Sequence, residues 1–325
     1  DAEITYLCRP WLQKFIAGRY PYIHRAIAIP YYPKLNDPPP TEAIDEAAIA
    51  AFFARMRAEQ FDLAIQMHGG GTESNPFVAS LGARRTLGLT GRDAPPLEAN
   101  LRYVFYQNEV LRYLELVGQL GVPWCGLGID LPLLQADFAL LDASGWHAPS
   151  AGYVVLHPGA GDPRRRWPLE CFARLAEFVF RHYGKAVVVG GNAAEEALVA
   201  DLRGLAQVPI IDVTGQLDVA AYAALISRAD LFVGNDTGPA HMAMALRVPS
   251  VVIYWCGNLI TAGPPTRQLF RPVLSWTVDC PACGRRHCGC RVSFVQDAPL
   301  AEALDQVADL LEAETSDGHQ SYRKG

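Results

Sequence analysis

The sequence predicts an α/β fold in which parallel strands alternate with helices in two domains. In the second half, short apolar runs such as Tyr153 to His157 and Ala186 to Val189 flank helix-length segments such as Leu169 to Tyr183. This alternation favours a doubly wound parallel sheet, whose ligands lie beyond the carboxyl ends of its strands. A chain of 325 residues exceeds the usual size of one domain, and a hydrophobic content of 50% is enough for two cores.

Composition and charge argue against two other classes of protein. The formal net charge of −6 gives no support for nucleic-acid binding, and no basic run stands out except Arg164-Arg165-Arg166. No uninterrupted apolar stretch reaches the length of a membrane span, and no signal peptide is visible. We therefore expect a cytoplasmic protein.

In the first half, strand-like and helix-like segments also alternate. Pro30 to Pro40 contains five prolines, so this segment is expected to be a loop. Thr41 is the expected cap of the helix that follows, whose apolar residues recur every four positions. The expected elements are strands at 3–8, 23–29 and 61–67, helices at 10–17 and 101–120, and a helix carrying Ile44, Ala48, Phe52 and Met56.

A glycine-rich loop, His68 to Gly71, ends the strand expected at 61–67. It matches neither G-x-G-x-x-G nor G-x-x-x-x-G-K-[ST], so a flexible crossover is favoured over a phosphate-binding loop. Further along, the segment from Trp124 to Ser150 contains scattered proline and glycine and is interpreted as the passage between the domains.

The second half shows clear signals for the starts of its helices. Asn192 and Glu195 form an N-x-x-E pair close to a capping box, and Asp218 is the expected cap of another helix. The expected elements are strands at 153–157, 186–189, 210–213, 231–233 and 251–254, and helices at 169–183, from 192, 218–228, 239–246 and 299–314.

The stretch from Asp230 to Trp255 predicts a strand, a tight turn, a helix and a second strand. Asp236, Thr237 and Gly238 fill the turn, and Pro239 stands where a missing N–H costs nothing. The unpaired N–H groups and the positive dipole end of such a helix favour an anion. Thr237 adds a hydroxyl, Gly238 permits close approach, and His241 projects from the first turn. A phosphate is the expected guest, although these are also ordinary capping residues.

A second polar loop, His157 to Pro168, follows the strand expected at 153–157. Its three consecutive arginines would suit a diphosphate, because a guanidinium pairs with phosphate oxygens in a bidentate fork. The alternative is a solvated basic turn, which is the commoner case for an isolated arginine run.

Two segments resemble the signatures of the heptosyltransferase-like glycosyltransferases of family 9. One is D-T-G-P-x-H at 236–241, followed by M-A-M-A-L-x-V-P, and the other is H-P-G-A with R-R-W-P between His157 and Pro168. The resemblance covers about residues 1–312 and is strongest at 153–255. It implies two Rossmann-like domains facing across a cleft (GT-B type): an acceptor-side domain at 1–148, a nucleotide-sugar donor domain at 149–314, and a disordered tail at 315–325.

The resemblance also implies a set of donor-binding residues. Arg165 stands where the family usually has lysine, a change that keeps the charge and alters the geometry. The residues implied to bind the nucleotide-sugar donor are Arg165, Arg166, Gly190, Gly191, Asp236, Thr237, Gly238 and His241.

The activity implied is inverting transfer of heptose or a related sugar. The donor would be a nucleoside diphosphate sugar of the ADP-heptose kind, and the acceptor a lipid-linked glycan such as a lipopolysaccharide core, reached by peripheral contact with the inner membrane. No D-x-D motif occurs, so catalysis is expected to need no metal or other cofactor, as is usual in this family.

The catalytic base is not identified from the sequence. In the family it is an aspartate in a G-D turn after the first strand, and the first domain is expected to lack that strand at its amino-terminal end. His68 and His157 are the substitutes considered. A non-catalytic relative that binds a nucleotide or sugar is therefore the alternative function. A nicotinamide-dependent oxidoreductase is disfavoured because no G-x-G-x-x-G follows any predicted strand.

Half of the eight cysteines cluster near the carboxyl terminus. Cys280, Cys283, Cys288 and Cys290 form C-x-x-C-x4-C-x-C, with His287 inside the motif. Such thiols can hold a structural zinc ion or an iron–sulfur cluster, pair as disulfides, or stay reduced, and a catalytic role is not expected. The other four cysteines are scattered and are expected to act as small hydrophobes.

Overall fold

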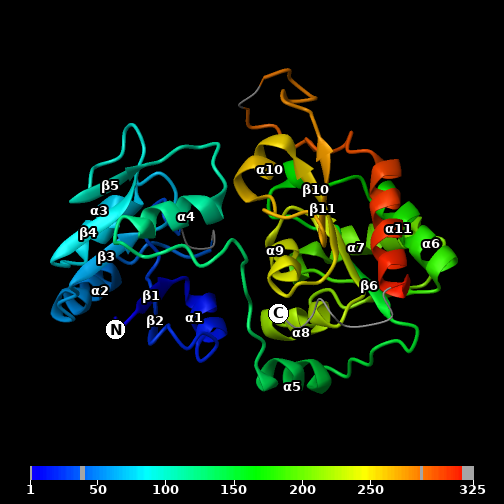
Figure 1. The fold of residues 1–325 in the computed structure, drawn as a ribbon, viewed down its shortest axis with the longest axis horizontal. Helices are drawn as coiled ribbons and strands as arrows, with labels where there is room; N and C mark the ends of the chain where they lie inside the picture. Colours follow the sequence, from blue (N-terminus) through cyan, green and yellow to red (C-terminus); the bar gives the residue numbers. More distant parts are fainter. Residues whose placement is uncertain (1, 37–40, 286–287, 317–325) are drawn as a thin grey trace. The chain divides into compact units, whose positions relative to one another are not determined.

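The computed structural model describes residues 2–36, 41–285 and 288–316, with side chains as far as residue 313. The chain forms two compact units, Asp1–Gly126 and Leu127–Gly325, and each contains parallel strands with helices (Figure 1). The predicted α/β class with two such domains is therefore confirmed. Residues 317–325 of the predicted tail lie outside the described part of the chain.

The second unit is built on a six-stranded sheet of order β11-β10-β9-β6-β7-β8, and all its pairings are parallel. Its strands are β6 (Tyr153–His157), β7 (Ala186–Val189), β8 (Ile210–Asp212), β9 (Leu231–Asn235), β10 (Ser250–Trp255) and β11 (Phe270–Ser275). Its helices are α5 (Gln135–Ala143), η1 (Pro163–Arg165), α6 (Leu169–Tyr183), η2 (Ala193–Glu195), α7 (Glu196–Leu205), α8 (Val219–Ser227), α9 (Gly238–Ala245), α10 (Cys256–Ala262) and α11 (Leu300–Ser316).

Helices cover both faces of this sheet, as a doubly wound fold requires. Along β6, Val154 and Leu156 enter one buried cluster while Tyr153 and Val155 enter another, because successive strand residues point to opposite faces. The first cluster includes side chains of α6, α7 and α11, and α6 and α11 lie side by side in Figure 1. The second includes side chains of α5, α8 and α9.

Helix starts and ends in this unit follow the predicted signals. The Asn192–Glu195 capping box is present, and Asp218 Oδ1 accepts a hydrogen bond of 2.8 Å from the Ala221 N–H. Helix α6 has the predicted bounds, and it ends because Gly184 adopts a left-handed backbone with φ of 63°. The segment expected to join the domains contains α5, which packs against α8, so residues 127–148 group with the second unit.

The first unit has two small parallel sheets, β1-β2 and β3-β4-β5. Its strands are β1 (Thr5–Cys8), β2 (Arg25–Ala28), β3 (Leu63–Gln66), β4 (Arg85–Thr90) and β5 (Ala99–Arg102). Its helices are α1 (Pro10–Ile16), α2 (Glu46–Ala58), α3 (Ser74–Ser80) and α4 (Glu109–Gly118). Asp45, and not Thr41 as predicted, caps α2, because its Oδ1 accepts from the Ala47 and Ala48 N–H groups at 3.0 Å.

The prediction of one long helix over 101–120 is wrong. Its first residues belong to β5, where Leu101 pairs with Leu89 of β4. Helix α4 begins only after Asn108, whose Oδ1 accepts a capping hydrogen bond of 3.0 Å from the Val110 N–H. Phe105, which a continuous helical stripe would bury, is 62% exposed. The helical spacing of apolar residues in this segment therefore arose by chance, because the first of them lie in a strand and the later ones in a separate helix.

The elements that were not predicted are α3, β4, β5, α5, η1, α10 and β11. The last contains Pro272, which is tolerated because β11 is the edge strand of its sheet. Within the described ranges, no helix combines the length and the apolar character that crossing a membrane requires.

Candidate functional site

The candidate site lies at the carboxyl ends of β6 and β9, which are neighbours in the sheet. After β6 the chain passes through α6 to β7 on one side, whereas after β9 it passes through α9 to β10 on the other. Such a reversal of strand order opens a crevice where ligands of doubly wound folds bind. The loop at 158–168 and the turn at 236–237 both begin there.

Asn235, the last residue of β9, holds the loop after β6 in place. Its side chain is fully buried. Its Nδ2 donates to the Pro158 carbonyl at 2.7 Å, and its Oδ1 accepts from the Trp167 N–H at 3.0 Å. Trp167 is itself buried, and its indole N–H donates to the Ala298 carbonyl at 3.1 Å. Sequence analysis missed Asn235 because it ends an otherwise apolar strand.

Asp236 is contacted by the side chains of three residues: Arg165, Asn258 and His241. Arg165 Nη1 donates to the Asp236 carbonyl at 3.0 Å and lies 3.3 Å from its Oδ2. Asn258 Nδ2, which was not predicted, donates to the same Oδ2 at 2.6 Å. His241 Nε2 lies 3.4 Å from Oδ1. The carboxylate thus orients one cation and one imidazole at the start of α9.

The charge of Asp236 survives its burial. Burial alone would raise the pKa of this carboxyl, whose side chain is 3% exposed. Hydrogen bonds from His241 and Asn258, together with the charges of His241 and Arg165, outweigh burial and hold the pKa below its ordinary value. Asp236 is therefore ionised at neutral pH and acts as a fixed anchor for Arg165.

The three arginines of the loop have different partners. Arg164 pairs with Asp162 at 2.6 Å, and Arg166 donates from Nε and Nη2 to the Ala160 carbonyl at 3.0 and 2.9 Å. Both therefore shape the turn. Arg165 uses Nη1 for Asp236, and its side chain is 32% exposed. A guanidinium has five N–H donors, so Arg165 keeps donors for a ligand.

The start of α9 is open. Thr237 occupies the N-cap position, yet its hydroxyl makes no capping hydrogen bond, and Pro239 stands in the first turn as predicted. At Gly238, apart from its chain neighbours and the backbone of its own helix, no heavy atom of the described residues lies within 4 Å of where a Cβ would be. The Thr237 hydroxyl and the adjoining backbone N–H groups are thus placed where an anion can reach them.

Gly190 and Gly191, after β7, are required by close packing in the structure. A Cβ at Gly190 would collide with the Tyr222 ring, and one at Gly191 would crowd Glu195. Glu195 is buried, and its Oε2 accepts from the Asn192 backbone N–H at 3.0 Å. A contact of either glycine with a nucleoside stays a prediction.

His157 lies at the end of β6, buried beneath these loops. Its Nδ1 is 3.2 Å from the Tyr222 hydroxyl. Burial lowers the pKa of the imidazole, and the charge of Glu195 and a hydrogen bond with the Gly190 backbone only partly oppose this. The buried His157, in contact with the Tyr222 hydroxyl, therefore supports the packing beneath the site.

In the first unit, the glycine-rich loop is a crossover from β3 to α3 held by neutral hydrogen bonds. The buried Gln66 donates to the His68 carbonyl and accepts from the Leu89 N–H at 2.9 Å. The Gly91 N–H donates to the Gly70 carbonyl at 2.7 Å. His68 is exposed, and residues 68–71 contain no other ionisable side chain, although Glu73 at the end of the crossover pairs with Lys34 at 3.5 Å.

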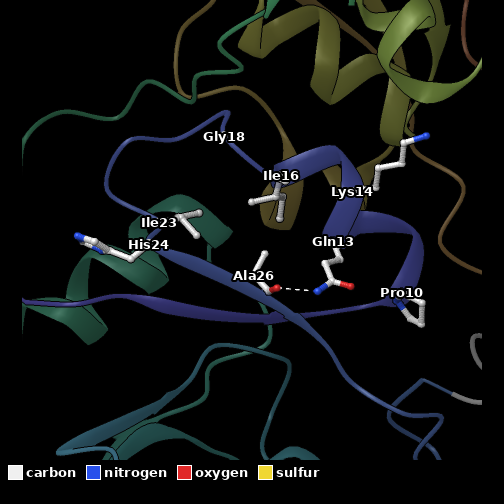
Figure 2. A pocket seen from close by; sticks show the side chains of 9 residues that line it. Pro10, Gln13, Lys14, Ile16, Gly18, Ile23, His24 and Ala26 are labelled. Carbon is white, nitrogen blue, oxygen red and sulfur yellow. Dashed lines mark hydrogen bonds between the residues drawn. The ribbon is translucent and has the colours of Figure 1, made fainter. Parts of the chain in front are cut away.

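A pocket of about 420 Å³ also lies in the first unit, between α1 and β2 (Figure 2). Its wall includes Lys14 and His24, whose polar ends point in different directions. Gln13 Nε2 donates to the Ala26 carbonyl at 2.8 Å. The pocket has room for a ligand, but its polar groups do not converge on one point as they do in a specific site.

The four clustered cysteines converge as the motif predicts. The Sγ atoms of Cys280, Cys283, Cys288 and Cys290 all lie within 4.8 Å of one another, and none forms a disulfide. Cys280 is buried, whereas Cys283 is exposed. His287 lies outside the described residues. Of the scattered cysteines, Cys8 is buried and Cys125 is exposed.

Comparison with known proteins agrees with the fold and the motifs. The model of glycosyltransferase family 9 (heptosyltransferase) matches residues 49–288. Lipooligosaccharide heptosyltransferase 2 of Haemophilus ducreyi is 28% identical over 299 residues, which are 84% of this chain and 78% of the relative. The lipopolysaccharide core heptosyltransferase OpsX of Haemophilus influenzae is 22% identical over 224 residues, which are 66% of this chain and 63% of that relative.

Solved structures share the fold over nearly the whole chain. A family 9 glycosyl transferase from Veillonella parvula superposes with a TM-score of 0.75 at 19% identity, covering 96% of this chain and 88% of that one. E. coli ADP-heptose lps heptosyltransferase II gives 0.72 at 18% identity, covering 97% and 91%. E. coli heptosyltransferase WaaC with ADP gives 0.60 at 18% identity, covering 98% and 90%.

Proposed function

The chain belongs to glycosyltransferase family 9 (heptosyltransferase), and from this premise we propose that it transfers heptose or a related sugar. The donor is a nucleoside diphosphate sugar of the ADP-heptose kind, and the acceptor is a lipopolysaccharide core or a similar lipid-linked glycan. The observation that carries the proposal is the arrangement of Arg165, Asp236 and His241 around the open start of α9.

The chemistry of the donor fits that arrangement. A diphosphate carries negative charge that a guanidinium and a helix N-terminus both stabilise. Arg165 supplies the first and α9 the second, and Thr237 is the N-cap residue of α9. The solved E. coli WaaC with ADP supports an adenosine diphosphate as the nucleotide.

The reaction proposed is an inverting displacement. The acceptor hydroxyl oxygen forms a bond to the anomeric carbon while the bond from that carbon to the diphosphate oxygen breaks. The electron pair stays on the departing diphosphate, and a base takes the hydroxyl proton. Arg165 and the start of α9 stabilise the developing negative charge, the role that a metal ion has in other transferases. Catalysis by this route requires no cofactor.

The base remains unassigned. His157, one of the two substitutes considered, is buried against Tyr222, and its pKa is lowered by that burial. A catalytic base has to lie within hydrogen-bond reach of the hydroxyl of the glycan acceptor, and His157 is not exposed enough to do so.

The first unit is proposed to contact the glycan acceptor, and peripheral contact with the inner membrane would bring the enzyme to a lipid-linked glycan.

Binding of ADP and adenosine to matched variants tests the donor site. Arg165→Ala should weaken ADP binding about tenfold or more, because a charge-assisted hydrogen bond contributes about 1.5–3 kcal/mol, and adenosine binding should not change. Arg203→Ala is the control, since Arg203 pairs with Asp212 at 3.4 Å in the same unit. Equal losses for both ligands would contradict the diphosphate assignment.

Turnover of ADP-heptose with a lipopolysaccharide-core acceptor tests the transfer itself. The proposal expects sugar to appear on the acceptor in a reaction that chelators do not abolish. Binding of ADP without any transfer would favour the alternative, a non-catalytic relative that binds the nucleotide, for which the unassigned base is the specific argument.

A further inference from the structure

The loop between β11 and α11 contains the four clustered cysteines and has no helix or strand of its own among its described residues. Figure 1 shows this loop, in orange, extending from one end of the sheet. Residues 281–285 are all exposed, so no apolar core fixes this part of the chain. A short exposed segment of this kind needs a covalent or metal cross-link to hold a single conformation.

The cysteine side chains are arranged for one metal ion. Four thiolates around an ion at about 2.3 Å lie about 3.8 Å from one another, which fits the separations of up to 4.8 Å found here. The first pair lies on a tight turn, where the Gly284 N–H donates to the Cys280 carbonyl at 2.8 Å. Gly284 has φ of +68°, which glycine adopts without strain.

This cysteine loop is bonded to the arginine turn of the candidate site. The Phe294 N–H donates to the Arg164 carbonyl at 2.7 Å, and the Ser293 hydroxyl donates to the Arg166 carbonyl at 2.7 Å. Arg165 lies between those two residues. Phe294 is buried and packs on Trp255 with ring centroids 5.0 Å apart. The backbone on both sides of Arg165 is thus held by residues that closely follow Cys290.

From these observations we propose that Cys280, Cys283, Cys288 and Cys290 bind one structural metal ion that braces the arginine turn. Four thiolates select zinc or iron among the common metals. The ion fixes the four cysteines, residues 293 and 294 then hold the carbonyls of Arg166 and Arg164, and Arg165 is kept against Asp236. The proposal that the cysteines bind a metal does not depend on the proposed function, whereas the effect of the metal on donor binding rests on that function.

Metal analysis of the intact chain, purified without chelators, tests the site. We expect about one zinc or iron ion per chain, lost in Cys283→Ser and retained in Cys125→Ser, an exposed cysteine outside the cluster. Metal-free protein reloaded with Zn²⁺ or Fe²⁺ alone identifies the ion. Absence of both metals from the wild-type chain, or equal metal content in the two variants, would overturn the site.

Hydrogen exchange tests the bracing. Removing the metal from the folded wild-type protein should speed amide exchange at 293–294 and at 164–166, and leave exchange in β3 and β4 unchanged. It should also weaken ADP binding severalfold. Unchanged exchange at 164–166 would overturn the bracing. If the wild-type chain does not bind ADP at all, the donor proposal fails while the metal content and the exchange still decide this one.

Discussion

The two units each place a glycine-containing loop after a parallel strand, and the difference between the loops shows what marks a binding site. In the first unit, Gln66 ties the loop after β3 to neutral backbone and hydroxyl groups. In the second, Asn235 ties the loop after β6 in a similar way, but the next residue, Asp236, gathers Arg165 and His241. In both loops the glycines serve the backbone geometry. Only in the second loop do charged side chains converge on one residue, and this is what marks it as the candidate binding site.

The largest effect on the free energy of unfolding is expected when one buried asparagine in each unit is replaced by alanine. Asn235→Ala leaves the Pro158 carbonyl and the Trp167 N–H without a partner, and should cost about 2–4 kcal/mol of unfolding free energy. Asn75→Ala removes comparable bonds to the Leu89 and Pro95 carbonyls. Denaturation should show losses for both, but only Asn235→Ala should also weaken ADP binding, by about tenfold.

That contrast fails if Asn75→Ala weakens ADP binding as much as Asn235→Ala does. The nucleotide would then depend on the first unit, and the charged turn in the second would not be the donor site.

A smaller effect is expected at Asp236, where the charge can be removed with little change in shape. Asp236→Asn keeps an acceptor for Asn258 but loses the ionic attraction that holds Arg165. We expect ADP affinity to fall about three- to tenfold, because charge-assisted contacts contribute roughly twice as much as neutral ones. Asp212→Asn, which affects the Arg203 pair instead, should leave the affinity unchanged in the same titration.

The smallest effect concerns pH and two histidines: His68, which follows β3, and His157, which ends β6. Because burial lowers the pKa of His157 below 6.5, the unfolded chain takes up its proton at a higher pH than the folded chain does. The contribution of neutral His157 to the free energy of unfolding is fully present above pH 6.5 and is lost as the pH falls below that value. The free energy of unfolding decreases through this residue by no more than about 1.4 kcal/mol per pH unit.

Unfolding free energies measured from pH 7.5 to 5 check this. His157→Gln should remove that part of the pH dependence, whereas His68→Gln, which changes an exposed side chain, should keep the wild-type profile. Identical profiles for His157→Gln and the wild type would show that His157 is not a buried neutral group.

Much of the second unit was predictable because its local signals agree with its tertiary packing. The bounds of α6 follow from an amphipathic segment and a left-handed glycine after it, and the caps at Asn192 and Asp218 depend on neighbouring residues alone. In the first unit, β4 was not predicted and part of β5 was assigned to a helix, because pairing partners distant in sequence decide whether such short apolar runs become strands.

The candidate site was predictable in its residue types but not in its internal bonds. The motifs pointed to Arg165, Arg166 and Asp236, yet only tertiary structure shows that Arg165 pairs with Asp236 while Arg166 binds the Ala160 carbonyl. Asn235 and Asn258 were missed because an amide at the end of an apolar strand, or in a later helix, has no local signal. Their partners lie 22 to 77 residues away in sequence.

Hydrogen exchange of the wild-type chain, with and without ADP, tests the central claim most directly. The donor diphosphate is proposed to bind at the carboxyl ends of β6 and β9. ADP should therefore slow exchange at 158–166 and 236–241, adenosine should slow it less there, and the glycine-rich loop at 68–71 should not change. Protection by ADP at 68–71, with none at 158–166 or 236–241, would contradict the account.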